Sequence, residues 1–351
     1  MPCSPELVKT RTAIACGLLL LQLVASGCGT SGVTSGSGPA SFLSKGPISG
    51  PVIGYAWDRA ASGLRPIFGV SGAARLGAAL YANQSFNGAA ASVRRQFALL
   101  TSTTGEVFLT ALPDGQPSLL SPKLSTQQQI ALSPSGNAAI IYAHDLTAIT
   151  LVTGLPTSPV LQTIHLPATA DHAVVGDSGA VLIATTQSDG TSALRSLAAT
   201  GVTAPITTLS QFGAMAFLPK GTSAMVADAG QNAIELASGI GSVTSISQIA
   251  SSADGVARPV AIASSSDGRW AIIANQSGSS IVRVDLSGNT PTTTVQCSCS
   301  PSLLAPIAGN GVFRLTELGA GPLSVFDGDA VKPRVFLIAG VQAISSQGMI
   351  R

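Results

Sequence analysis

Residues 258–289 read RPVAIASSSDGRWAIIANQSGSSIVRVDLSGN, and this stretch decides the fold class. It contains three short apolar runs, Val260–Ala263, Trp270–Ala274 and Ile281–Leu286. Asp267-Gly268 separates the first run from the second, and Asn275–Ser280 separates the second from the third. Apolar runs divided by Asp, Gly, Asn and Ser are typical of antiparallel strands joined by tight turns. The stretch therefore predicts a three-stranded meander.

The same pattern, a turn glycine followed by a short apolar strand, recurs along the chain. The structural turn glycines are Gly63, Gly105, Gly136, Gly179, Gly221, Gly268 and Gly311. Successive glycines are 42, 31, 43, 42, 47 and 43 residues apart, and the step of 31 fits least well. A period of about 40–50 residues with several strands is typical of propeller blades, which cover one another's faces around an axis. We therefore predict an all-β fold with a single β-propeller of seven blades, in preference to a β-sandwich without repeats.

Residues 259–286 resemble a repeat of the YVTN and lactonase-like seven-bladed propeller families. The residues that carry the resemblance are Pro259–Ile262, Ser266–Arg269, Ala271–Asn275 and Ile281–Leu286, and Ser133–Gly136 matches less closely. The resemblance implies the propeller fold. It also implies that an enzyme of this kind would hold acidic and polar residues, or His and Arg, in its axial cavity. No such motif is found here residue by residue, and we predict no catalytic residue and no cofactor.

The first 28 residues have the features of an export signal. Lys9 and Arg11 precede the apolar run Thr12–Val24, which is too short to span a membrane. Ala25-Ser26-Gly27-Cys28 resembles a bacterial lipobox, with Ala25 in the place of the usual leucine. The resemblance implies that Cys28 is lipidated. The alternative is ordinary signal cleavage near Ala25 to Gly27, which leaves Cys28 free or removes it.

Residues 29–45 are rich in Gly and Ser and are expected to form a flexible tether between the signal peptide, residues 1–28, and the propeller domain, residues 46–351. Gly29 follows the cysteine directly, as in lipoproteins sorted to the outer membrane. We therefore expect an exported protein at the bacterial cell envelope that faces the periplasm or the surface, or a secreted protein if Cys28 is not lipidated.

Composition limits the partners of the chain. Charged residues make up 10% of the chain, where about 25% is usual, and the formal net charge is +2. No stripe of Lys or Arg is present, which argues against nucleic-acid binding. Beyond Val24 no apolar run approaches the ~20 residues of a spanning helix, so membrane contact is expected only through the lipid anchor. We expect a monomer, and we expect the apolar run Arg334–Ala339 to close the ring by pairing with N-terminal strands.

Only Cys297 and Cys299 belong to the predicted body, because Cys3, Cys16 and Cys28 precede it. A C-x-C pair is either unpaired or locally bridged, and in both cases it is structural. The alternative is a redox or metal-binding pair, for which a soft metal would need further ligands.

The remaining polar motifs are read as structural. Gly176–Gly179 reads GDSG, as in the nucleophile segment of trypsin-like proteases, but the upstream histidine motif is missing and Gly179 falls in a predicted turn. The histidines, His144, His165 and His172, are expected at solvated turns or blade edges. Asp228 is predicted to be equivalent to Asn275, both bonding the backbone of a turn. A metal site at the axis is left open, since ligands from distant blades meet there.

Three functions remain. The first is a binding or scaffold module that presents loops to an envelope protein or glycan. The second is a small-molecule hydrolase, lactonase-like, with its site at the propeller axis. The third is a redox or metal-linked accessory protein that uses Cys297 and Cys299. Converging acids and histidines at the axis would favour the second, and a neutral axis would favour the first.

Overall fold

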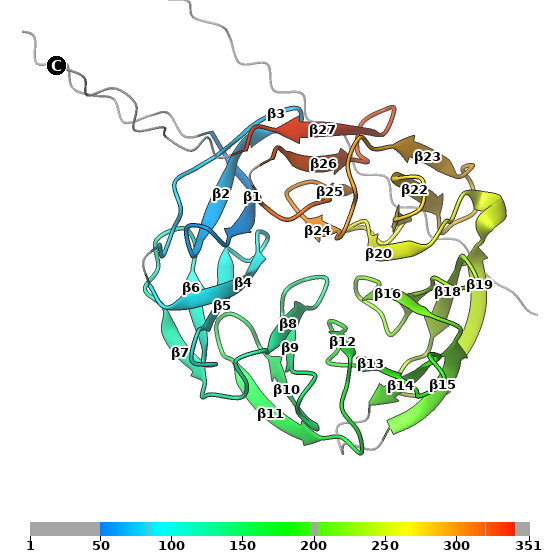
Figure 1. Cartoon of the computed structure of the whole chain (residues 1–351), viewed down its shortest axis with the longest axis horizontal. Helices are drawn as coiled ribbons and strands as arrows, with labels where there is room; N and C mark the ends of the chain where they lie inside the picture. Colours follow the sequence, from blue (N-terminus) through cyan, green and yellow to red (C-terminus); the bar gives the residue numbers. More distant parts are fainter. Residues whose placement is uncertain (1–49, 83, 198–202, 320, 341–351) are drawn as a thin grey trace, which may run out of the picture. The chain divides into compact units, whose positions relative to one another are not determined.

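Seven antiparallel sheets surround a common axis, one after another in chain order (Figure 1). Six sheets have four strands and one has three. The computed structural model describes residues 50–82, 84–197, 203–319 and 321–340, which belong to a unit that runs from Ile48 to Arg351. The predicted signal peptide, the tether and Cys28 lie outside the described residues. The prediction of a seven-bladed β-propeller is confirmed.

Each blade is a meander whose strands follow one another outward from the axis. The strands of blades 1 to 3 are β1 (Val52–Asp58), β2 (Gly63–Val70), β3 (Ala73–Leu76), β4 (Phe86–Ser92), β5 (Phe97–Ser102), β6 (Val107–Ala111), β7 (Ser118–Ser121), β8 (Gln129–Leu132), β9 (Ala138–Tyr142), β10 (Ala148–Thr153) and β11 (Val160–His165). The strands of blades 4 and 5 are β12 (His172–Val175), β13 (Val181–Thr186), β14 (Ser192–Leu197), β15 (Thr203–Leu209), β16 (Phe212–Phe217), β17 (Ala224–Asp228), β18 (Ala233–Ser238) and β19 (Ser245–Ala250).

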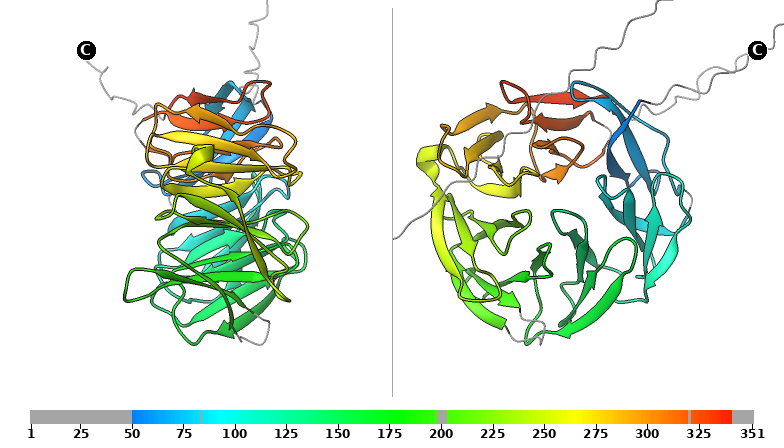
Figure 2. Two further views of the ribbon diagram at one scale, coloured as in Figure 1. Left: turned by 90° about the vertical axis from the view of Figure 1, so that its right-hand side faces the viewer. Right: turned by 180° about the vertical axis from the view of Figure 1, so that it is seen from behind.

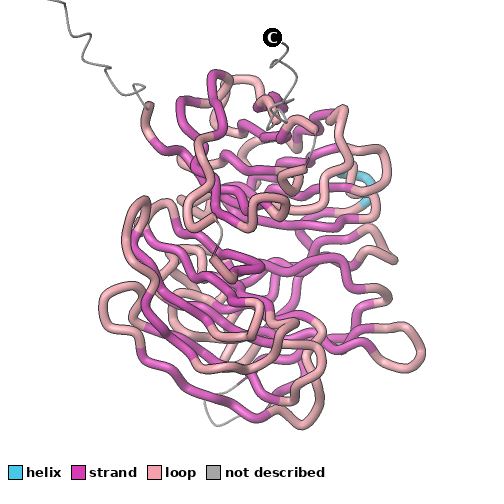
Figure 3. Tube along the Cα trace, turned by 60° about the vertical axis from the view of Figure 1, so that its left-hand side comes forward, coloured by secondary structure: helices cyan, strands magenta, loops and turns pink. Residues whose placement is uncertain are grey.

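The strands of blades 6 and 7 are β20 (Pro259–Ser264), β21 (Trp270–Asn275), β22 (Ser280–Asp285), β23 (Thr293–Gln296), β24 (Ala305–Pro306), β25 (Val312–Arg314), β26 (Leu323–Asp327) and β27 (Arg334–Ile338). In the described residues the one helical element is a single 3-10 turn, Ser252–Asp254 (Figure 3). None of the described helices is long and apolar enough to cross a membrane.

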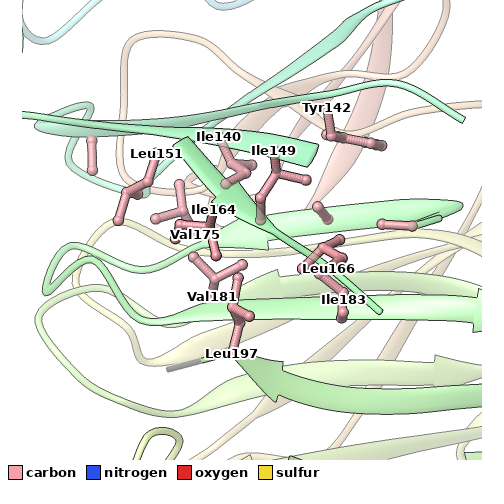
Figure 4. Close-up of a cluster of buried hydrophobic side chains, with 13 residues drawn as sticks. Ile140, Tyr142, Ile149, Leu151, Ile164, Leu166, Val175, Val181, Ile183 and Leu197 are labelled. Atoms are coloured by element: carbon pink, nitrogen blue, oxygen red, sulfur yellow. The ribbon is translucent and has the colours of Figure 1, made fainter. Parts of the chain in front are cut away.

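The core lies between neighbouring blades rather than in one central layer. Between blades 3 and 4, buried side chains of both sheets pack face to face (Figure 4). Those labelled in the figure are Ile140, Tyr142, Ile149, Leu151, Ile164, Leu166, Val175, Val181, Ile183 and Leu197. Similar clusters lie between the other pairs of blades. Because the second strand of a blade is covered on both faces, it is a continuous apolar run, such as Ala138–Tyr142.

The strands run along the axis of the ring, so the turns lie on two opposite faces (Figure 2). In each four-stranded blade the turn between strands 1 and 2 and the turn between strands 3 and 4 share one face, because antiparallel strands alternate in direction. We call this the first-turn face. The first turns are residues 93–96, 133–137, 176–180, 218–223, 265–269 and 307–311.

Blade 1 begins one strand later than the others. Asp58 ends β1 as Asp228 ends β17 and Asn275 ends β21, and β17 and β21 are second strands. The residue before the next strand has a positive φ in all three blades, 45° at Ser62, 52° at Asn232 and 44° at Ser279. The strands β1, β2 and β3 therefore correspond to strands 2, 3 and 4 of the other blades.

This offset explains the irregular spacing of the turn glycines. Gly136, Gly179, Gly221, Gly268 and Gly311 lie in first turns, as the sequence predicts. Gly105 lies instead in the next turn, between β5 and β6, and Gly63 is the first residue of β2. The step from Gly105 to Gly136 is short because the two glycines stand in different turns. Gly63 serves close packing, since a Cβ there would lie 2.8 Å from the Leu80 carbonyl oxygen.

The expectation that Arg334–Ala339 pairs with N-terminal strands is wrong. β27 is the outermost strand of blade 7 and pairs with β26, with Leu323 opposite Ile338 and Asp327 opposite Arg334. The physical reason is that blade 7 takes all four of its strands from this part of the chain. Arg334–Ala339 directly follows β26, the third strand of that blade, and pairs with it.

Candidate functional site

A cavity of about 390 Å³ lies at the axis, and all seven blades contribute to its walls. Its lining comes mainly from the innermost strands and the first turns, with further residues from β2 and β25. The apolar part consists mainly of Tyr55, Trp57, Leu64, Ile130, Leu132, Val174, Val175, Met215, Phe217, Ile262, Ile307 and Phe313. Ser133, Ser266 and Asn310 line it at the first turns, and Trp57, Leu64 and Arg314 line it at the opposite strand ends.

The chemistry of the lining is limited. Among the described residues that line the cavity, Arg94 and Arg314 are charged, and none is Asp, Glu or His. General acid–base catalysis and divalent metal binding both need such groups within reach of one another. The arrangement can hold an apolar or neutral group, but its described residues supply no proton-transfer pair.

Two buried donors face this region without a partner. Arg314 is 8% exposed and donates through Nη1 to the Thr316 carbonyl and to Glu317 Oε2, each at 3.1 Å. Its Nε and the Nε1 of Trp57 have no acceptor among the described residues. Sequence reasoning missed both residues, because neither belongs to a recognisable motif.

The first-turn face is joined by hydrogen bonds between blades. Asp177, in blade 4, accepts from the backbone N–H of Ser135 in blade 3 at 2.8 Å and of Lys220 in blade 5 at 3.2 Å. Burial opposes the ionisation of Asp177, but the hydrogen bonds outweigh it and hold its pKa below the usual value. Ser178 is exposed. The GDSG segment is therefore a turn whose carboxylate joins three blades.

A second inter-blade contact joins the first turns of blades 6 and 7. The Asn310 amide oxygen accepts from the Ser266 hydroxyl at 2.8 Å and from the Asp267 backbone at 2.9 Å. The Asn310 Nδ2 group donates to Asp267 Oδ2 at 2.9 Å. These contacts fix the rim of the cavity. The sequence identified Asp267 only as part of a local turn, and it did not identify Asn310.

The histidines lie away from the cavity. His144 and His172 are at the strand ends opposite the first turns, with ring centroids 6.2 Å apart, and His172 stacks on Phe212 at 4.1 Å. Burial, and then the charge of His144, lowers the pKa of His172. His144 Nδ1 is 3.9 Å from Asp171 Oδ1. His165 is exposed at the end of β11. In the part of the chain that the structure describes, no three His, Cys, Asp or Glu residues gather as a metal site.

The acidic residues within blades act on turns and strand ends. Asp228 is 2% exposed and accepts from the N–H groups of Ser210, Gly230 and Gln231. Asn275 is fully buried and bonds the segment after the 3-10 turn, accepting from the Ala257 N–H and donating to the Gly255 carbonyl. Asp58 accepts from Ala60 and Ala61 and pairs with Arg65, and Asp285 pairs with Arg269.

Cys297 and Cys299 form a disulfide at the end of β23, with Cα atoms 5.0 Å apart. Cys297 is 7% exposed and packs in the cluster between blades 6 and 7. The bridged structural pair is thus the alternative that the geometry favours. The pair lies at the outer strand of blade 6, away from the axis.

Comparisons with known proteins show likeness in fold alone. No known family profile matches this chain, and no curated protein matches it. Virginiamycin B lyase from Staphylococcus aureus is 15% identical over 74% of this chain and 86% of that one, with a TM-score of 0.53. A functionally unknown protein from Desulfotomaculum acetoxidans is 15% identical over 83% and 100%, with a TM-score of 0.56. A dihydro-heme d1 dehydrogenase is 16% identical over 72% and 55%, with a TM-score of 0.50. The structural neighbours have different functions, so the fold does not assign one.

Proposed function

We propose that this chain is an exported β-propeller that acts as a binding module at the bacterial cell envelope. The observation that carries the proposal is the lining of the axial cavity, in which the described residues offer two arginines and no carboxylate or imidazole. A rigid ring with hydrogen-bonded rims suits a platform for binding. A lactonase-like hydrolase is not favoured, because it would need an acid or base at the axis.

The surface proposed for binding is the first-turn face, and the partner proposed is a protein. Val243 and Val331 stand in the turns between strands 3 and 4 of blades 5 and 7, and they are 91% and 102% exposed. Exposed aliphatic side chains on one face are available for apolar contacts at the centre of a protein interface.

The partner can be sought by photo-crosslinking in the producing cell. A photoreactive amino acid at Val243 or Val331 should give one discrete protein adduct. The matched control is Ser188, which is exposed in the turn between β13 and β14 on the opposite face. Equal adducts from all three positions, or none from Val243 and Val331, would refute the choice of face. An adduct of twice the chain's mass would contradict a monomer, and adducts with glycan alone would replace the protein partner.

The envelope location rests on Cys28. With Cys28 intact the mature protein should begin at that residue, carry a lipid detected by mass spectrometry, and fractionate with membranes. The variant Cys28→Ser should move to the soluble fraction with its propeller unchanged. A mature N-terminus elsewhere, or unchanged membrane fractionation of the variant, would leave a secreted protein as the better description.

A further inference from the structure

One end of the axial cavity, opposite the first turns, combines apolar walls with donors that lack acceptors. Arg314 ends β25 and Trp57 stands one residue before the end of β1, and both residues line the cavity. They are 8% and 9% exposed. Arg314 Nε and Trp57 Nε1 have no acceptor among the described residues. Because a buried donor without an acceptor is costly, the group that this end lacks is one that carries an oxygen acceptor.

The charge of Arg314 is only partly balanced within the chain. Its Nη1 is 3.1 Å from Glu317 Oε2, but the Glu317 side chain is 55% exposed, whereas that of Arg314 is 9% exposed. An ion pair with one partner in solvent is screened and contributes little. The described lining of the cavity includes no carboxylate. The guanidinium group is therefore available to an anionic group that enters the cavity.

The carboxylates nearest the other end of the cavity are already engaged. Asp177, Asp267 and Asp329 lie at the first-turn face, and each accepts hydrogen bonds from backbone N–H groups of first turns. None of the three lines the cavity. Arg94 does line it, from the first turn of blade 2, and is exposed. Two cations in an apolar lining that holds no anion favour a negatively charged ligand over a positively charged one.

The remaining wall suits an apolar body. Ile130, Met215 and Ile262 line the cavity from the inner strands of blades 3, 5 and 6. The volume of about 390 Å³ lies within the range of small-molecule sites. Ala216 and Ala263 also line the cavity, so part of this volume depends on small side chains.

We propose that the axial cavity binds a small carboxylate with an apolar chain, with the carboxylate on Arg314 and the chain along the apolar wall. Arginine suits this role because its planar fork of donors matches the geometry of a carboxylate. The site is separate from the protein interface proposed at Val243 and Val331, which do not line the cavity. Either proposal can therefore fail without the other.

Calorimetric titration of the purified full chain with octanoate, below its micellar concentration, tests the choice of ligand. Octanoate should bind with one molecule per chain. Octanamide has the same alkyl chain without the charge and should bind at least about tenfold more weakly, because hydrogen bonds between charged groups are the stronger ones. Equal affinities for the two compounds, or no binding of octanoate, would overturn the proposal.

Three variants test the place of the site. Arg314→Gln should weaken octanoate binding about tenfold or more and change octanamide binding by less than about twofold. The matched control is Arg59→Gln, which is exposed in the turn between β1 and β2 and should leave both affinities unchanged. Ala216→Phe should weaken both compounds, because the larger side chain fills the cavity. Unchanged octanoate binding in Arg314→Gln or in Ala216→Phe would place the site elsewhere and reject the proposal.

Trp57 gives a readout that does not depend on the folding of Arg314→Gln. The chain has two tryptophans, so Trp270→Phe leaves Trp57 as the single indole. Octanoate should shift the emission of this variant, with half-saturation at the dissociation constant found by calorimetry. The combination with Ala216→Phe should lose the shift. An emission that does not respond to bound octanoate would show that the ligand lies outside the cavity and would reject the proposal.

Discussion

At the scale of single residues, the residue that ends a blade's second strand makes hydrogen bonds to both the preceding connection and the following turn. Asp228 illustrates this, because one carboxylate joins the connection from the previous blade to the turn that follows its own strand. Burial opposes its ionisation, yet the bonds from Ser210 and the backbone hold its pKa below the usual value. The Asn275 side chain makes equivalent contacts, because its amide oxygen accepts from the Ala257 N–H and its amide nitrogen donates to the Gly255 carbonyl.

Replacing Asp228 with alanine should therefore destabilise the propeller. The change leaves buried N–H groups without an acceptor, at about 1–3 kcal/mol for such a loss. Denaturant unfolding of Asp228→Ala should show the decrease, while Asp189→Ala, at an exposed turn, serves as the control. Equal stability of the two variants would contradict this account.

The equivalence of Asp228 and Asn275 could be predicted from the sequence, because both stand at the same distance from a local turn. The contacts of Asp177 could not. Its partners, Ser135 and Lys220, belong to neighbouring blades 42 and 43 residues away, and nothing in a turn motif states which turn lies beside it. For the same reason the donors of Trp57 and Arg314 could be found only in the structure.

At the scale of elements, the first turns act together. Asp177→Ala should lower the free energy of unfolding by about 1–3 kcal/mol, because two inter-blade N–H groups lose their acceptor. Ser178→Ala should be neutral within about 0.5 kcal/mol, as expected for an exposed side chain. Thermal and denaturant unfolding of the two neighbouring variants measures the difference. A stable Asp177→Ala protein would show that the turns are held by packing alone.

The disulfide closes a very short loop, so its removal should matter less than the loss of a long-range bridge. Cys297→Ala with Cys299→Ala should lower stability by no more than about 2 kcal/mol, since loop-closure stabilisation grows with loop length. Denaturant unfolding of the oxidised protein and the double variant gives the comparison. A larger loss, or metal bound by the reduced protein and not by the variant, would restore a functional role for the pair.

The strands themselves were predictable because each second strand is a short apolar run flanked by turn residues. The place of each strand within its blade, first, second, third or fourth, was not predictable. Gly63 and Gly105 follow the same local pattern as Gly136 but stand one turn later, since the pattern of a turn and a strand is similar at both places. Which run becomes the innermost strand of a blade is decided by which strands pair with one another, and a local pattern does not contain this.

At the scale of the whole molecule, hydrogen-bonded carboxylates make stability depend on pH. The pKa values of Asp58, Asp177, Asp228 and Asp267 are all lowered, because hydrogen bonds outweigh the opposing effect of burial. A carboxyl group whose pKa is lower in the folded protein stabilises the fold at pH values above its pKa in the unfolded chain. This stabilisation is lost as the pH falls through the pKa of the folded state.

The unfolding temperature should therefore be nearly constant from neutral pH to about pH 5 and should fall below about pH 4, near the ordinary pKa of aspartate. Thermal unfolding across this range measures it. The loss should be smaller in Asp228→Asn than in the natural sequence, because one titrating group has been removed. An unfolding temperature that rises on acidification would contradict the assignment.

The two tryptophans lie in contrasting surroundings. Trp57 is buried at the edge of blade 1, and its indole N–H has no partner among the described residues. The guanidinium groups of Arg269 and Arg283 lie over the ring of Trp270, 4.6 and 4.2 Å from its centroid. The chain thus carries two intrinsic optical probes, one with short-wavelength emission from an apolar site and one sensitive to nearby cations. Variants that keep only one indole would let fluorescence follow blade 1 and blade 6 separately.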